Sequence, residues 1–190
     1  MSKKHNPRQT EDSEKYEGRI FISSLKEASY LLSSNTWGNK IRYVVSIGSP
    51  RENPPANLMP KNFRRNVLRL EFDDNPRIEG DIIDEGPQLY DMEKLISWGE
   101  KSLKTGEIIL CHCQAGISRS SAAAFTLHCM DLGPGMETEA KDQVLLSRPI
   151  AYPNLRMVSF ADFLLERDGA MVNAFQERFK NDSRLNPIQY

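Results

Sequence analysis

Nine consecutive residues decide how this chain is interpreted: His112-Cys113-Gln114-Ala115-Gly116-Ile117-Ser118-Arg119-Ser120. The apolar run before them, residues 107–111, predicts a strand, and residues 118–130 have the pattern of a helix. The nine residues therefore form a strand-to-helix turn, which we call the 112–120 loop. Backbone amides in such a turn and in the first turn of a helix have no intrahelical partner, so they form a concave nest that suits an anion.

Two side chains of the 112–120 loop add chemistry to this nest. Cys113 lies in the turn, where a helix N-terminus and a nearby cation favour the thiolate, the nucleophilic form of cysteine. Arg119 follows six positions later with a planar guanidinium that can hold two phosphoryl oxygens. A buried thiol and a surface cation would explain this pair alone. The complete nine-residue string instead favours a site for phosphoryl transfer.

The other residues of the 112–120 loop support this interpretation. Gly116 permits a positive φ or a close approach of the backbone to the anion, and the Ala115 methyl leaves the pocket open. The Ser120 hydroxyl can donate to the Cys113 thiolate and help it to leave a phosphorylated intermediate. We expect His112 to orient the loop by hydrogen bonding rather than to act as a base. The expected phosphate-binding residues are Gln114, Ala115, Gly116, Ile117, Ser118 and Arg119.

The string HCQAGISRS resembles the HCxxGxxRS motif of the protein tyrosine phosphatase superfamily, in surroundings similar to its dual-specificity branch. Residues 147–154, SRPIAYPN, resemble the R-P-x-x-x-P-N stretch of dual-specificity phosphatases. Residues 161–172 are more similar to small bacterial tyrosine phosphatase-like proteins. This resemblance covers about residues 18–176 and implies a cysteine phosphatase fold, a phosphocysteine intermediate and a hydrogen bond from Asn154 to the loop.

The resemblance also implies an acid that protonates the leaving group from an upstream loop. A strand predicted over residues 66–72 runs into Asp73-Asp74-Asn75-Pro76. In the family the acid follows an apolar residue and one variable position, which selects Asp74 over Asp73. Asp81 remains an alternative because its spacing to the nucleophile is closer to that of the family, and Asp73 is the third candidate. Asp, Asn and Pro also favour turns, with or without a catalytic role.

Predicted strands and helices alternate along the chain. Strands are expected over residues 18–22, 41–47, 66–72 and 107–111, and helices over 25–32, 87–103, 119–130, 137–147, 154–166 and 170–180. This order predicts an α/β fold with a mainly parallel central sheet of four to five strands, flanked by helices on both faces. The strand ends would gather the site on one side of the sheet. Four cations lie in or just after the loop over residues 48–62: Arg51, Lys61, Arg64 and Arg65. They either face an anionic substrate or are solvated.

Length and composition fit one domain. The 190 residues are 39% hydrophobic, and we expect a disordered tail over 1–17, a single catalytic domain over 18–180 and a C-terminal tail over 181–190. A net charge of −1 gives no general attraction to nucleic acid or to an anionic membrane. The sequence predicts neither a transmembrane helix nor a signal peptide.

The three cysteines do not suggest a disulfide framework. A catalytic thiol requires a reducing compartment, so the cytoplasm is the expected location. Cys111 and Cys129 are expected in the core, although Cys111 is also placed to trap an oxidised Cys113. We expect no metal and no cofactor, because no cluster with metal-ligand spacing is present. The expected partner is a phosphorylated protein bound by a monomer, without nucleic acid or membrane.

The sequence therefore predicts a cysteine-dependent phosphomonoesterase, and the resemblance implies phosphotyrosine, with phosphoserine and phosphothreonine as further substrates. Three alternatives use the same loop: an RNA 5′-phosphatase, a phosphoinositide phosphatase and a phosphate-binding pseudophosphatase. Phosphoinositide enzymes resembling this family often have Lys in the loop, where this chain has Gln114, Ala115, Ile117 and Ser118. RNA calls for a basic surface, and pseudophosphatases usually lose the cysteine or the arginine, both of which are present.

Overall fold

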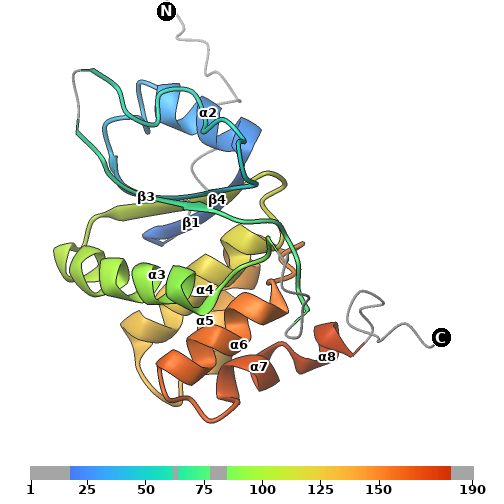
Figure 1. The fold of residues 1–190 in the computed structure, drawn as a ribbon. Coiled ribbons are helices and arrows are strands. Elements are labelled where there is room, and N and C mark those ends of the chain that lie inside the picture. The colour runs from blue at the N-terminus through green and yellow to red at the C-terminus, as the bar shows by residue number, and fades with distance from the viewer. Residues whose placement is uncertain (1–17, 62–63, 78–84, 181–190) are drawn as a thin grey trace, which may run out of the picture.

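The computed structural model describes residues 18–61, 64–77 and 85–180. A parallel four-stranded sheet lies at its centre, in the order β1 (Ile20–Ser24), β4 (Ile108–Cys113), β2 (Ile41–Gly48), β3 (Asn66–Glu71). Helix α2 (Leu25–Ser33) and the segment after β2 cover one face of the sheet, and all later helices lie on the other side (Figure 1). The predicted α/β architecture is confirmed.

The central strands β2 and β4 are buried on both sides. Val44, Val45, Ile109 and Leu110 have no exposed surface, as expected for a parallel sheet whose faces are both covered by other elements. β4 continues two residues beyond the predicted strand and ends at Cys113, which pairs in register with Ser24 at the end of β1. The 112–120 loop therefore starts from the most deeply buried part of the fold.

Six α-helices of the described chain lie on the second side of the sheet: α3 (Leu89–Ser102), α4 (Arg119–Leu132), α5 (Glu137–Ser147), α6 (Leu155–Leu164), α7 (Ala170–Ala174) and α8 (Gln176–Phe179). Of these, α3, α4 and α5 contact the strands, and α6 and α7 pack against those helices. α4 follows the 112–120 loop and is almost wholly buried, with Ala122, Ala123 and Ala124 allowing its close approach to the sheet. The helix predicted over 170–180 is interrupted at Phe175, whose ring packs edge-on against Phe125 of α4 at a centroid distance of 4.9 Å.

Helix α2 begins where β1 ends, because Ser24 and Glu27 form a capping box. The Ser24 hydroxyl accepts from the Glu27 amide at 3.2 Å, and the Glu27 carboxylate accepts from the Ser24 amide at 2.8 Å. The next amide, that of Leu25, donates to the carbonyl of Gln114 at 3.2 Å. The start of α2 therefore contacts the 112–120 loop directly.

Of the four cations considered in and after the 48–62 loop, Arg65 is buried, whereas Arg51, Lys61 and Arg64 are exposed. The Arg65 guanidinium donates to the carbonyl oxygens of Leu32, Gly38, Ile41, Asn57 and Leu58. These carbonyls belong to α2, to the turn between α2 and β2, to β2 and to the segment between β2 and β3. Arg65 therefore ties this layer together and does not face a substrate.

Within the part of the chain that the structure describes, no helix is both long and apolar enough to cross a membrane. The tails predicted over residues 1–17 and 181–190 lie outside the described residues, and so does Asp81.

We predict that Arg65→Met lowers the free energy of unfolding by about 3 kcal/mol, because buried carbonyl groups lose their charged donor. Arg64→Met changes the neighbouring exposed cation in the same way and should lie within about 0.5 kcal/mol of the wild type. Urea denaturation followed by circular dichroism measures both. Equal stabilities of the two variants would show that the Arg65 contacts contribute nothing.

Candidate active site

A pocket of about 310 Å³ opens where the ends of β3 and β4 meet the start of α6. It is lined by Asp74, Cys113, Gln114, Ala115, Ile117, Ser118, Arg119 and Tyr152. The structure thus brings the 112–120 loop together with a residue that lies beyond the end of β3. Loops that follow parallel strands meet at the carboxyl edge of the sheet, which is why these distant segments converge.

The carbonyl oxygens of five consecutive loop residues all accept hydrogen bonds from the surrounding structure. The donors are the Leu25 amide to Gln114 (3.2 Å), Arg148 Nη2 to Ala115 (3.3 Å), Arg148 Nε to Gly116 (3.0 Å), the Tyr152 amide to Ile117 (2.8 Å) and the Asn154 amide to Ser118 (3.3 Å). In a trans peptide the carbonyl and the following amide point in opposite directions, and no cis peptide occurs in the described chain. The amides of residues 115–119 therefore point away from these donors and are available to an anion in the pocket.

Gly116 packs the loop directly against the junction of β1 and α2. Its φ is +71°, and a Cβ at this position would lie 2.6 Å from the Ser23 carbonyl carbon and from the Ser24 amide nitrogen. Any other residue would clash with backbone atoms and adopt an unfavourable conformation. The glycine is therefore required by the backbone path as well as by the pocket.

The Cys113 thiol lies at the base of the loop and is 2% exposed. Its Sγ is 3.2 Å from the Oγ of Ser120, which is fully buried in the first turn of α4. The hydroxyl can donate to a thiolate at this distance. The strand-to-helix turn thus holds the Cys113 thiol and the Ser120 hydroxyl in contact, although the two residues are seven positions apart in the sequence.

Arg119 is also buried, with 5% of the residue exposed. Its Nη1 donates to the carbonyl of Phe72 at 2.7 Å and to Ser49 Oγ at 3.3 Å, which fixes the side chain against the ends of β2 and β3. Its Nε has no hydrogen-bond partner among the described residues. A buried donor without a partner is unusual, and an oxyanion in the pocket that Arg119 lines could supply one.

Asp74 is the carboxylate that the described structure brings into the pocket. Its Oδ1 accepts from Ser118 Oγ at 2.6 Å and from Asn154 Nδ2 at 2.8 Å. Asn154 in turn caps α6 by accepting from the Met157 amide at 3.1 Å. Asp73 does not line the pocket, and its amide donates to the Glu85 carbonyl at 2.7 Å. The Asp74 side chain is therefore anchored both to the 112–120 loop and to the start of a helix.

His112 and the two other cysteines lie in the interior. Burial, with Arg69 nearby, lowers the pKa of His112 to about 4, and the Cys113 backbone opposes this shift only in part. The ring is therefore neutral at neutral pH and adds no charge to the site. Cys111 and Cys129 are buried free thiols, and burial raises the pKa of Cys129 to about 12. Burial and the neighbouring Cys113 raise the pKa of Cys111 as well.

Arg148 and Glu27 support the loop from outside, and sequence reasoning assigned neither a role there. Arg148 Nη1 donates to Glu27 Oε1 at 3.0 Å, while its other nitrogens bind the two loop carbonyls. Burial opposes ionisation of Glu27, but hydrogen bonds from the Ser24 backbone and Arg148 outweigh it and lower the Glu27 pKa. The S-x-x-E spacing of a capping box was visible in the sequence. Its pairing with an arginine after α5 was not.

We predict that Arg148→Met weakens binding of inorganic phosphate about tenfold, because two loop carbonyls lose their donors and can turn toward the anion. Arg19→Met is the matched control. Arg19 also binds a carboxylate, that of Asp131, and a carbonyl, that of Leu103, but it does so at the end of α4 that is remote from the 112–120 loop. Isothermal titration calorimetry at constant salt measures both affinities. If the two variants lost the same affinity, the support of the loop by Arg148 would be disproved.

No family model matches the sequence, and the search among curated proteins found no match. Solved structures with the same fold do exist. A mouse protein described as a dual specificity phosphatase, in complex with zinc tungstate, shares 22% identity at a TM-score of 0.55, over 81% of this chain and 86% of its own. The human tyrosine phosphatase-like serine/threonine/tyrosine-interacting protein shares 23% identity at a TM-score of 0.55, over 77% of this chain and 90% of its own.

A third similar structure is PTPMT1 in complex with PI(5)P, which shares 16% identity at a TM-score of 0.53, over 82% of this chain and 94% of its own. These identities are low, so the likeness establishes the fold. The fold that the 112–120 loop and its resemblance implied is therefore confirmed. Among residues 18–61, 64–77 and 85–180, no group of three or more His, Cys, Asp or Glu side chains is placed to hold a metal ion.

Proposed function

From the fold shared with dual-specificity phosphatases, we propose that residues 18–180 form a catalytic domain that hydrolyses phosphate monoesters, above all phosphotyrosine in proteins. One observation carries this proposal: the pocket joins the Cys113 thiol, the Arg119 guanidinium and the Asp74 carboxylate to a loop in which the five carbonyls of residues 114–118 bond to groups outside it. Nucleophile, charge-stabilising donors and acid are the groups that this reaction requires.

In the first step the Cys113 thiolate attacks phosphorus, and the bond from phosphorus to the ester oxygen breaks. The leaving oxygen takes a proton from Asp74, whose Oδ1 is held by Ser118 and Asn154 while Oδ2 makes neither of those bonds. The loop amides and Arg119 hold the three equatorial oxygens as charge builds on them. The product is a phosphocysteine, and the alcohol departs.

In the second step Asp74, now a carboxylate, takes a proton from a water molecule as the water oxygen attacks phosphorus. The sulfur–phosphorus bond breaks, inorganic phosphate leaves and Cys113 returns to the thiolate. The Ser120 hydroxyl, 3.2 Å from the sulfur, donates to the departing thiolate and stabilises it. The cycle ends with both groups in their starting protonation states.

The pocket lining favours a monoester of an otherwise weakly charged group. Arg119 is the one cation among the lining residues, and the phosphoryl group itself uses it. Tyr152 supplies an aromatic wall that is fixed in place, because its hydroxyl donates to the Arg178 carbonyl at 2.6 Å and its ring packs edge-on against Phe179. Such a wall suits an aryl ester, which supports phosphotyrosine over the phosphoinositide that PTPMT1 binds and over a phosphorylated RNA end.

We predict that Cys113→Ser abolishes turnover of an aryl phosphate while phosphate binding stays within about threefold of wild type, since the loop amides and Arg119 remain. A colorimetric assay and calorimetry measure the two properties. Loss of binding together with turnover would point to a collapsed loop. Turnover at the wild-type rate would disprove the mechanism. Excess chelator in the wild-type assay should change the rate by less than twofold.

The leaving-group acid has its own prediction. A tyrosyl ester has a phenol leaving group with a pKa of about 10, so it needs protonation, whereas an activated aryl ester does not. Asp74→Asn should therefore slow hydrolysis of a phosphotyrosine peptide at least a hundredfold and that of an activated aryl ester much less. The measurement is kcat for both substrates across pH.

Asp73→Asn and Asp81→Asn are the controls, made in parallel. Both should keep the wild-type ratio of the two rates. If Asp81→Asn alone produced the loss that depends on the leaving group, the acid would lie on the segment outside the described residues, and Asp74 would be the wrong assignment.

A further inference from the structure

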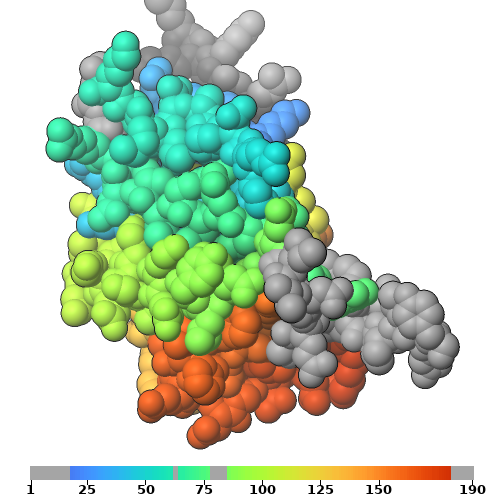
Figure 2. Space-filling view, in the orientation of Figure 1, coloured from blue at the N-terminus to red at the C-terminus, as the bar shows by residue number. Residues whose placement is uncertain are grey.

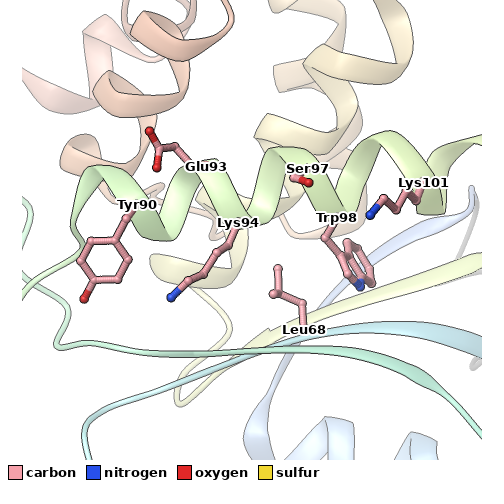
Figure 3. A pocket seen from close by; sticks show the side chains of 7 residues that line it. All are labelled: Leu68, Tyr90, Glu93, Lys94, Ser97, Trp98 and Lys101. Carbon is pink, nitrogen blue, oxygen red and sulfur yellow. The ribbon is translucent and has the colours of Figure 1, made fainter.

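A second hollow, of about 460 Å³, lies between α3 and β3 and is separate from the pocket of the 112–120 loop. It is lined by Leu68, Tyr90, Glu93, Lys94, Ser97, Trp98 and Lys101. Figure 3 shows Leu68 rising from β3 and Trp98 pointing from α3 toward it, with Tyr90 and Lys94 on the same side of the helix. We call this hollow the α3–β3 groove. On the face seen in Figure 2 the two elements adjoin across the surface.

The floor of the α3–β3 groove is apolar and firmly held. The Trp98 ring packs edge-on against Tyr43 at a centroid distance of 5.8 Å, and its Nε1 donates to Asn66 Oδ1 at 2.8 Å. Leu68 shares its face of β3 with the buried Leu70, because alternate residues of a strand point to the same side. Both Trp98 and Leu68 are nevertheless only partly buried. The groove therefore offers a preformed apolar surface that no described residue covers completely.

The rim of the groove is positively charged on the side of the strand. Lys94 and Lys101 are exposed residues of α3, and the Lys94 ammonium lies 4.6 Å from the centre of the exposed Tyr90 ring. Glu93 points to the opposite side of the helix in Figure 3. The lining thus carries two cations and one carboxylate, that of Glu93, and both cations lie on the side of the strand above the apolar floor, which favours acidic groups that flank an apolar side chain.

The backbone of β3 adds a third feature. In the described sheet β3 is a terminal strand that pairs only with β2, so one edge of its backbone faces away from the sheet. Such an edge can pair with an extended peptide, whose side chains on one face would then point toward the α3 side. Between Tyr90 and Lys101, the helix extends about 17 Å at 1.5 Å per residue. About five residues of an extended chain cover that length.

We propose that the α3–β3 groove binds an extended acidic segment of the protein substrate, with one aliphatic or aromatic side chain over Leu68 and Trp98. The inference rests on the proposed function, because it concerns the protein that carries the phosphoryl group. Tyr90 lies at the start of α3, and the chain beyond β3 leads to Asp74 in the catalytic pocket. A substrate chain that follows the end of β3 would lead from the groove toward the pocket, and the groove would then select among phosphoproteins.

The test compares a charge-reversed groove with a matched control. Lys94→Glu with Lys101→Glu reverses both cations, and Lys40→Glu with Lys141→Glu makes the same charge change elsewhere on the surface. The substrates are a phosphotyrosine peptide with an acidic, leucine-containing flank, the same peptide with a Gly-Ser flank, and a small aryl phosphate. The groove variant should lose about tenfold in kcat/KM on the acidic peptide and less than twofold on the other two. The control should retain all three rates.

A second variant tests the shape of the groove without changing its charge. Ser97→Trp places a large side chain at an exposed position of the lining. It should weaken binding of a fluorescent, unphosphorylated peptide with the acidic flank until its affinity equals that of the wild-type protein for a basic control peptide. Fluorescence anisotropy measures this binding without catalysis. If the acidic peptide binds to the wild-type protein but no phosphate ester is hydrolysed, the proposed function is wrong, whereas the assignment of the groove as a peptide-binding site is supported.

Three results would overturn the docking proposal. Equal losses in the groove variant and the control would show that only overall charge matters. A loss on a 5′-phosphorylated oligonucleotide without a loss on the peptide would assign the groove to nucleic acid. A concentration-dependent dimer in analytical ultracentrifugation that the groove variant abolishes would assign it to a second copy of this chain.

Discussion

The structure depends on one constraint, which is that five consecutive carbonyl groups of the 112–120 loop, those of residues 114–118, are held from outside. Donors from the start of α2, from Arg148 and from the segment before α6 bind these carbonyls one after another. A loop of this kind exposes several amides with the same polarity, and an isolated chain would not keep them aligned, because free carbonyls would turn inward and compete for the anion. The surrounding elements prevent this rotation.

The rest of the fold can be understood as the support for these donors. β4 carries the loop out of the core and pairs with β1, so that Ser24 lies beside Cys113 in register. β1 ends at Ser24, so α2 begins directly after it. The Glu27 carboxylate that caps α2 also forms an ion pair with Arg148. The Glu27 carboxylate has a lowered pKa for this reason. A helix cap, an ion pair and the loop thus form one connected network, in which changing one member affects the others.

The same arrangement ties the acid to the nucleophile. Asp74 comes from the segment after β3, yet its carboxylate is held by Ser118 within the loop and by Asn154 at the N-cap of α6. Arg119 reaches back to the Phe72 carbonyl near the same strand end. The positions of acid, cation and thiol relative to one another are therefore set by hydrogen bonds between three segments rather than within any one of them, which reduces the reorganisation that a reaction would require.

The sequence alone was sufficient for the elements whose signals are local. The apolar runs of β2 and β4, the Ser24 cap of α2 and the glycine of the 112–120 loop follow from burial, capping and backbone conformation, which involve residues close in the chain. It also placed Cys113 and Arg119 together, because both lie in a single turn. Only the tertiary structure showed that Arg65 is an internal tie, that Arg148 holds the loop, and that a groove lies beside β3. These features are contacts between residues far apart in sequence, and such contacts arise from the packing of the layers, which no local pattern encodes.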